Sequence, residues 1–406
     1  AVIKYTRDVY LLDDNEFVVM DRNGVSILSA NGERIDKNIY KVTWSEDAAE
    51  KGGYDSFMLK EIHEQPKAIK DTISSRVSIE NGVFFDDFKL SKQDLDNVDR
   101  VFIVACGTAY HAGLMGKTLI ERMAKIPVEV DIASEFRYRN PLVTEKSLVI
   151  IVSQSGETAD TLAALRDCNR IGARTLAITN VVGSTISREA NDVIYTMAGP
   201  EIAVASTKAY TTQVVVMHLL ALYFGKIKGI LEETKEKEIV RALLILPDRI
   251  EKLLEEKENI EDIARLLAKE EDLFFLGRGM DYALALEGSL KLKEISYIHC
   301  EAYAGGELKH GTIALIEKGT PVIAIATQEK LFEKMVSNME EVRARGAYVV
   351  AIAQSHNKDV EKAADKIIYI PNSDDILSPI LAVVPMQLLA YHVSVLRGCD
   401  VDKPRN

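Results

Sequence analysis

The sequence predicts an α/β protein that contains two copies of one parallel-sheet module. From about residue 99 to the end of the chain, short apolar runs typical of buried strands alternate with helical patterns. This alternation is characteristic of parallel sheets flanked by helices. Segments of the first half also recur in the second half, at an offset of 172 residues for Gly107 and Gly279 and 174 residues for Gln154 and Gln328. A duplicated α/β module explains both observations.

The internal repeat consists of four segment pairs that occur in the same order. Each pair joins a predicted strand to its counterpart further along the chain: 101–107 with 273–279, 149–154 with 322–328, 172–178 with 346–352, and 193–195 with 367–369. Four ordered matches at nearly one offset are difficult to obtain by chance. We therefore expect two domains of the same topology.

The first 80 residues precede this repeat and follow a different pattern. Residues 1–50 contain short apolar runs separated by turn signals, including Asn23-Gly24 and Asn31-Gly32, and Asn-Gly between such runs predicts β-hairpins. The expected structure is a small β meander, too short for a complete domain. Residues 54–78 place apolar side chains among charges with one interruption at Pro66, which predicts a helical linker with a kink.

Length and composition narrow the class of protein. A chain of 406 residues accommodates two or three domains. The formal net charge of −12, without a Lys/Arg-rich run, argues against nucleic acid and anionic membranes as partners. No apolar run approaches the ~18 residues of a membrane span, and no signal-peptide pattern opens the chain. The chain begins Ala-Val-Ile-Lys, without Met, so we expect a processed protein or a piece of a longer one.

The cysteines and histidines predict neither disulfides nor a metal site. Cys106, Cys168, Cys300 and Cys399 are far apart and lack CxxC spacing, which is typical of free thiols in a reducing cytosol. The seven histidines form no HExxH or similar ligand cluster. We therefore expect a cytoplasmic protein without a bound metal.

A strand-to-helix loop in the first module is the strongest indication of a ligand site. The apolar residues 148–152 are followed by Ser153-Gln154-Ser155-Gly156-Glu157-Thr158, and a helical pattern then opens near Leu162. Hydroxyls and free backbone N–H groups at a helix start can bind a phosphate without Lys or Arg. The alternative is an ordinary Ser/Thr N-cap. The second module has Thr-Gln-Glu-Lys at 327–330, so only the first module looks specialised for phosphate.

A charged stripe marks the first helix of the second module. At ~100° per residue, Glu287, Lys291 and Glu294 fall within about 60° of one another, between apolar flanks. The flanks favour a position in a cleft, where a carboxylate beside Lys can act as a base toward carbon acids. Helix position alone favours an exposed i,i+4 Glu–Lys pair.

Three other segments carry candidate residues. The Gly-rich segment 301–312 displays His310; a lone His is more often structural, but beside a sugar or acyl substrate it could donate a proton near neutral pH. Residues 106–109 follow a strand and precede a helix, as a ligand-facing loop does. Cys106 there is a candidate nucleophile, but a buried thiol is the preferred interpretation because no base can be assigned. Residues 204–208 are rich in hydroxyls, although most such loops only cap helices.

These motifs together resemble the isomerase part of the glutamine–fructose-6-phosphate aminotransferase family. The matching pieces run in order along nearly the whole chain: 60–66, 105–108, 153–158, 203–212, 286–311 and 398–406. The resemblance implies two tandem SIS (sugar isomerase) domains, each a flavodoxin-like three-layer sandwich with a parallel sheet. It also implies conversion of fructose 6-phosphate to glucosamine 6-phosphate with ammonia from glutamine, and no metal, nucleotide or prosthetic group.

The resemblance assigns roles to particular residues. It implies that phosphate is held by Ser153, Gln154, Ser155 and Thr158, and that the sugar is contacted at the positions of Thr108, Ala109, Val204 and Ser206. Glu294 would move a proton between C1 and C2, and Lys291 would assist at the hydroxyls. His310, contributed by the neighbouring subunit of a homodimer, would help to open the sugar ring.

The resemblance also divides the chain into parts. These are a remnant of a glutaminase domain (1–50), a linker (51–80), the phosphate-binding SIS domain (81–228), the SIS domain with the catalytic Glu and His (240–395) and a truncated tail (396–406). Three departures from the family are expected to matter: no N-terminal catalytic Cys, no tail Lys to form an imine with the sugar, and Ala109 where the family usually has Ser.

Two other functions compete with this interpretation. A plain aldose–ketose isomerase would not need the linker and the β remnant. A sugar-phosphate sensor would be expected to carry a helix-turn-helix or a basic patch, and the sequence indicates neither. The sensor also gives Glu294 no role.

Overall fold

A computed structural model describes residues 5–405 except 14, 23, 43–49, 87, 256 and 257. The chain forms two compact units, Ala1–Gly53 and Tyr54–Asn406. The predicted turn residue Asn23 and the terminal residues Ala1 and Asn406 lie outside the described part.

The N-terminal unit is a β meander, as the hairpin signals predict. Its main sheet is antiparallel in the order β2-β3-β4, and β1 pairs with β5. The strands are β1 (Asp8–Val9), β2 (Glu16–Asp21), β3 (Gly24–Ser29), β4 (Arg34–Ile35) and β5 (Tyr40–Lys41). Gly32, at φ +81°, lies in the predicted Asn31-Gly32 turn between β3 and β4. Phe17, Val19 and Met20 on β2 are 58%, 50% and 77% exposed, so this sheet leaves much of its apolar surface uncovered.

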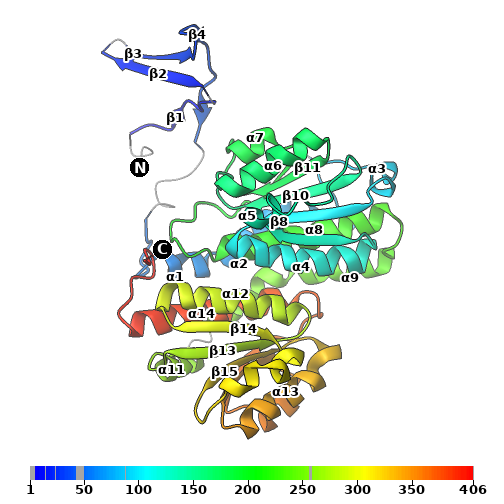
Figure 1. Cartoon of the computed structure of the whole chain (residues 1–406), viewed down its shortest axis with the longest axis vertical. Helices are drawn as coiled ribbons and strands as arrows, with labels where there is room; N and C mark the ends of the chain where they lie inside the picture. Colours follow the sequence, from blue (N-terminus) through cyan, green and yellow to red (C-terminus); the bar gives the residue numbers. More distant parts are fainter. Residues whose placement is uncertain are drawn as a thin grey trace. The chain divides into compact units, whose positions relative to one another are not determined.

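The second unit contains two parallel five-stranded sheets of identical topology (Figure 1). The first sheet has the order β12-β11-β10-β8-β9 and the second has the order β14-β13-β15-β16-β17. Numbered within each domain, both orders are 2-1-3-4-5, the flavodoxin-like arrangement. The strands are β8 (Arg100–Ala105), β9 (Val128–Ile132), β10 (Ser147–Ser153), β11 (Arg174–Thr179), β12 (Asp192–Tyr195), β13 (Asp272–Gly277), β14 (His299–Ala304), β15 (Pro321–Ala326), β16 (Tyr348–Gln354) and β17 (Lys366–Ile370). The predicted fold class and the internal repeat are therefore confirmed.

Helices cover both faces of each sheet. Successive side chains of a strand point to opposite faces, and in these strands the side chains on both faces are apolar. On β8, Phe102 packs in one cluster with α6 and α7, and Ile103 packs in another cluster with α4 and α8. The same division occurs on β13, where Phe274 faces the cluster that contains α13. The helices of the two domains are α3 (Lys92–Asp96), α4 (Gly107–Ala124), α5 (Ala133–Phe136), α6 (Ala159–Ile171), α7 (Thr185–Glu189), α8 (Lys208–Ile227), α9 (Glu233–Leu244), α10 (Leu246–Glu255), α11 (Glu258–Leu267), α12 (Met280–Ser296), α13 (Phe332–Ala344) and α14 (Ser378–Leu396).

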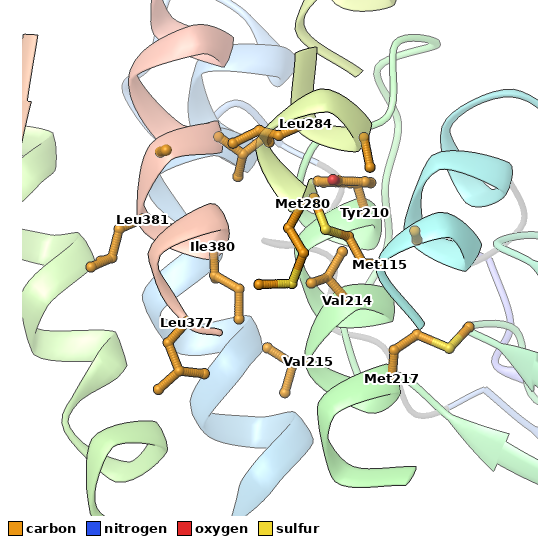
Figure 2. Close-up of a cluster of buried hydrophobic side chains, with 14 of the residues drawn as sticks. Met115, Tyr210, Val214, Val215, Met217, Met280, Leu284, Leu377, Ile380 and Leu381 are labelled. Atoms are coloured by element: carbon orange, nitrogen blue, oxygen red, sulfur yellow. The ribbon is translucent and has the colours of Figure 1, made fainter. Parts of the chain in front are cut away.

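Four of these helices form a shared apolar layer between the two sheets. Figure 2 shows Met115 of α4, Tyr210 and Val214 of α8, Met280 of α12 and Ile380 of α14 converging in one cluster. Because α8 and α14 are enclosed on all sides, their sequences are apolar around almost the whole circumference. This layer holds α4 of the first domain against α12 of the second.

The helix α14 corrects one sequence expectation. Among the described residues it is the one helix long and apolar enough to cross a membrane, whereas the sequence analysis found no such run. However, 83% of its apolar window is buried inside the protein, as in the core helix of a folded domain.

The predicted helical linker consists of two helices that pack into the core of the second unit. α1 (Phe57–His63) and α2 (Gln65–Ser74) meet at Glu64, and Pro66 lies at the start of α2, where a missing N–H costs least. Met58, Ile62 and Ile69 are fully buried. The remaining short elements are β6 (Val77–Ser78), β7 (Gly82–Val83), η3 (Gly305–His310), η4 (Thr312–Leu315), η5 (Glu329–Leu331) and η6 (Lys358–Lys362).

Candidate active site

A cavity of about 770 Å³ lies at the C-terminal ends of β8 and β10. This edge of a parallel sheet, between its first and third strands, is where doubly wound α/β folds bind ligands. The cavity brings together ten residues to which the family resemblance assigns roles: Thr108, Ala109, Ser153, Gln154, Ser155, Thr158, Val204, Ser206, Lys291 and Glu294. Both α/β domains therefore contribute to it, since α12 belongs to the second domain.

The loop 153–158 forms one wall of the cavity. The Ser153 and Thr158 hydroxyl oxygens lie 3.0 Å apart, and the Gly156 N–H donates to Ser153 Oγ at 3.1 Å. The α6 helix starts directly afterwards with Thr158 as its N-cap, and within the described part of the chain the Thr158 side chain makes no capping hydrogen bond. Thr158 is therefore an N-cap by position that lacks the side-chain bond of an ordinary cap, and the Ser155 hydroxyl accepts the Glu157 N–H at 3.2 Å within the loop. The amides of this helix start remain available to an anion.

Gly156 is required by the shape of this loop. Its φ of +68° lies in the left-handed region, and a Cβ at this position would lie 2.1 Å from the Ser184 Oγ atom. The close approach holds the loop 153–158 against the start of α7, where the Glu157 carboxylate also accepts the Thr185 N–H at 2.7 Å.

The second domain fills the equivalent position with its own carboxylate. By the repeat, Asp281 corresponds to Ala109 and Thr327 to Ser153. The Asp281 carboxylate accepts the Thr327 N–H at 2.7 Å and the Thr327 hydroxyl at 2.6 Å. Burial raises the pKa of Asp281 to about 6, although the hydrogen bonds from Thr327 act in the opposite direction. The Asp281 carboxylate would repel an anion at this position. This is a physical reason why the first module, with its loop 153–158, can bind phosphate and the second cannot.

The charged stripe on α12 forms the opposite wall. The Lys291 ammonium lies 2.7 Å from a Glu294 carboxylate oxygen and 3.9 Å from Glu287. Glu287 and Lys291 are 0% and 2% exposed, so the interpretation as an exposed Glu–Lys pair is wrong. The cleft interpretation is confirmed for Lys291 and Glu294, which line the cavity, whereas Glu287 lies behind them.

The start of α4 adds a hydroxyl and a thiol to the cavity. The Thr108 hydroxyl donates to Glu287 at 3.1 Å, so its oxygen is left to accept a hydrogen bond from a ligand hydroxyl. The preferred interpretation of Cys106 as a buried thiol is wrong, because this residue is half-buried and lines the cavity. The sequence could not show this, since the cavity is formed by segments that are far apart in the chain.

The loop 201–206 closes another side of the cavity and depends on two carboxylates. Glu201 accepts the Ser206 hydroxyl at 2.9 Å and the Thr207 N–H at 2.9 Å. Glu61 of α1 is 2% exposed and accepts the backbone N–H of Ile202 at 2.6 Å. Burial raises the pKa of Glu61 to about 8, and the nearby Glu201 carboxylate adds to the shift. The sequence does not reveal the role of either carboxylate, because nothing local to Glu61 or Glu201 indicates a contact between α1 and this loop.

The raised pKa of Glu61 predicts a pH-dependent stability. Between its ordinary value of 4.5 and about 8, the folded protein holds a proton that the unfolded chain releases, so rising pH destabilises the fold through this window. Glu61→Gln keeps the acceptor oxygen and removes the titration. We expect its thermal midpoint to exceed that of the wild type by at least about 3 °C at pH 8 and by less than about 1 °C at pH 5. The exposed Glu317→Gln is the control; equal midpoint differences at both pH values would contradict the assignment.

The end of α12 and the C-terminal segment each supply one cavity residue that the sequence did not indicate individually, Tyr297 and Arg405. The Arg405 guanidinium lies over the Tyr297 ring, 4.2 Å from its centre, and the backbone N–H of Arg405 donates to the Tyr297 hydroxyl at 3.1 Å. Both side chains line the cavity. The sequence signals were the matching motifs 286–311, which contains Tyr297, and 398–406, which contains Arg405. Arg405 adds a positive charge to the cavity that Lys291 and Glu294 also line.

Comparison with known proteins identifies the architecture and the family. The SIS domain family matches residues 94–223 and 266–397. A glutamine–fructose-6-phosphate aminotransferase (isomerizing) of Clostridium tetani is 59% identical over all 406 residues, which cover 67% of that protein. The corresponding protein of Methanosarcina acetivorans is 48% identical over 407 aligned residues, covering 100% of this chain and 66% of that protein. The chain belongs to the glutamine–fructose-6-phosphate aminotransferase family.

A solved structure of the same family agrees with the fold described above. The C-terminal domain of glucosamine–fructose-6-phosphate aminotransferase from Francisella tularensis superposes with a TM-score of 0.83 at 40% identity, covering 87% of this chain and 100% of that one. The family membership predicted from the motifs is therefore confirmed. The chain spans about two thirds of the length of its aminotransferase relatives.

His310 is the candidate that the structure does not bring to the cavity. It ends η3, is exposed, and is not among the described residues that line the cavity of its own chain. The location on a surface segment fits the expectation from the family resemblance that it serves another subunit, which stays a prediction.

The described residues contain no group of three His, Cys, Asp or Glu side chains that could hold a metal ion. All four cysteines are free. Burial raises the pKa of Cys168 and of Cys300 to about 12, so these two thiols are poor nucleophiles.

Proposed function

We propose that this chain performs the sugar-phosphate half of the aminotransferase reaction. It binds fructose 6-phosphate, opens the ring, accepts ammonia at C2 and moves a proton between C1 and C2 to yield glucosamine 6-phosphate. The observation that carries this proposal is the single cavity lined by the loop 153–158 on one side and by Lys291 and Glu294 on the other. A phosphate anchor facing a carboxylate base is the arrangement that this reaction requires.

The phosphate is held by backbone amides and hydroxyls at the start of α6. Ser153, Ser155 and Thr158 supply hydroxyls, and Gln154 supplies an amide beside them. The helix dipole favours the anion, which compensates for the acidic net charge of the chain. The sugar then extends toward Thr108, Ala109, Val204 and Ser206. Ala109 offers no hydroxyl, so one sugar hydrogen bond is absent at this position.

The chemistry is performed by protein groups. Glu294 is the base that takes the proton from C1 and returns it at C2, and Lys291 stabilises the developing negative charge on the sugar oxygens. Lys291 lies 2.7 Å from Glu294, so one side chain positions the other. The proposal includes no metal, nucleotide or prosthetic group, and it places the enzyme in the cytoplasm.

The complete enzyme includes partners beyond the described domains. We propose a homodimer in which His310 of one subunit serves the ring-opening step in the cavity of the other. Residues 1–50 are a remnant of a glutaminase domain that supplies the ammonia, and the uncovered apolar side chains of β2, including Phe17 and Met20, support this assignment. The domain ranges proposed above (51–80, 81–228, 240–395 and 396–406) complete the division of the chain.

An assay of the purified chain with fructose 6-phosphate separates the competing functions. Glucosamine 6-phosphate formed only when ammonia is present supports the proposal. Glucose 6-phosphate formed equally with and without ammonia would indicate a plain aldose–ketose isomerase. Tight binding of the sugar phosphate without deuterium exchange at C1 in D₂O would indicate a sensor.

The phosphate assignment predicts a selective loss of binding. Ser155→Ala is expected to weaken binding of fructose 6-phosphate by ~1–3 kcal/mol, the range for a charge-assisted hydrogen bond, and to leave binding of unphosphorylated fructose nearly unchanged. Calorimetry measures both ligands, with the exposed Ser74→Ala as the control variant. Equal losses for the two sugars would refute a phosphate contact at Ser155.

A further inference from the structure

A buried carboxylate connects the two SIS domains behind the cavity. Glu287 of α12 is 0% exposed and lies against α4 of the first domain. It accepts the Thr108 hydroxyl at 3.1 Å through one oxygen and contacts His111 Nδ1 at 2.7 Å through the other. Because a carboxylate only accepts hydrogen bonds, the His111 Nδ1 atom carries the proton in this contact.

His111 does not line the cavity among the described residues, but it lies at the start of a chain of contacts that reaches the cavity. Its side chain is 12% exposed. Glu287 lies 3.9 Å from the Lys291 ammonium, and this ammonium lies 2.7 Å from Glu294, so the series of contacts ends at Glu294. The last two residues are those assigned above to the sugar hydroxyls and to proton transfer.

The two oxygens of Glu287 have different partners, and this division fixes the position of Lys291. Oε1 faces both Thr108 and Lys291, whereas Oε2 is engaged by His111. Lys291 is correspondingly closer to Glu294 than to Glu287. Without the His111 donor, a buried oxygen of Glu287 would lose its hydrogen-bond partner, which costs free energy. Rotation of the Glu287 carboxylate toward the Lys291 ammonium would relieve this cost.

We propose that His111 is a positioning residue for proton transfer. By donating from Nδ1 to Glu287, it keeps that carboxylate from drawing Lys291 away from Glu294, and it keeps the Thr108 oxygen directed to the sugar. This role rests on the proposed function of Lys291 and Glu294. His111 acts through Glu287 and contacts no reacting atom.

The test compares two substitutions of His111 that differ in a single donor. His111→Asn places an amide N–H close to the position of Nδ1, whereas His111→Leu has similar bulk and no donor. We expect the Leu variant to lower deuterium exchange at C1 of fructose 6-phosphate by about 10- to 100-fold, with KM changed less than about threefold. We expect the Asn variant to retain at least about a third of the wild-type rate. Equal rates for the Leu and Asn variants, whether both high or both low, would overturn the proposal.

A structural measurement separates this proposal from the function on which it rests. Crystal structures of the two variants give the distances from Lys291 Nζ to Glu287 and to Glu294. The proposal expects the ammonium to move toward Glu287 in the Leu variant and to stay within hydrogen-bond distance of Glu294 in the Asn variant. An unchanged Lys291 in the Leu variant contradicts the role of His111 whatever the rates. A wild-type chain that exchanges no proton, with Lys291 displaced in the Leu variant, contradicts the proposed function and not the positioning.

Discussion

Replacing Glu294 by Gln is expected to reduce proton exchange at C1 of fructose 6-phosphate by roughly 10²- to 10⁴-fold. The amide keeps the size of the side chain and an oxygen that can accept from Lys291, which lies 2.7 Å away. It removes the lone pair that takes the proton. Because the loop 153–158 is untouched, we expect the affinity for the sugar phosphate to change little.

Deuterium incorporation from D₂O, followed by NMR, measures this exchange, and calorimetry on the same preparation measures binding. The exposed Glu317→Gln makes the same chemical change away from the cavity and is expected to exchange at the wild-type rate. Full exchange by the Gln variant of Glu294 would exclude this residue as the base. A parallel loss of binding would instead indicate that Glu294 mainly contacts the substrate.

The parts of the fold that the sequence predicted are those encoded by local patterns. A parallel sheet buried on both faces requires continuous apolar strands, and such runs are visible in the repeat. The loop 153–158 was recognisable because its strand, hydroxyls and helix start are contiguous. The family resemblance then assigned roles in one site to motifs that are distant in the sequence, and ten of the residues that it names line the cavity.

The parts that the sequence did not reveal depend on contacts between distant residues. His111 and Glu287 are 176 positions apart, and the Glu61 carboxylate meets the backbone of Ile202 across 141 positions. No local periodicity encodes such pairs. The same reason explains the wrong interpretation of the Glu287–Lys291 pair: helical spacing places two side chains on one face, but the packing of α4 against α12 decides whether that face is buried.

Mixing two inactive variants is expected to restore activity if His310 serves a neighbouring subunit. Glu294→Gln removes the base of its own cavity, and His310→Ala removes the histidine contributed to the partner. In a mixed dimer one cavity contains both substituted residues, and the other cavity contains Glu294 and His310 unchanged. We expect activity to return to at most about half of the wild-type value per mixed dimer, because a symmetric dimer has two equivalent sites.

The mixed-dimer experiment tests an arrangement that one subunit alone does not contain. His310 is exposed on η3 and lies outside the described lining of its own cavity, so a direct role within one chain would require η3 to move. Differently tagged variants allow mixed dimers to be purified and counted before assay. If these dimers form and stay as inactive as their parents, His310 serves its own subunit or has no catalytic role. Activity in the purified mixed dimer, with neither parent active, can arise only from a cavity that combines Glu294 of one chain with His310 of the other.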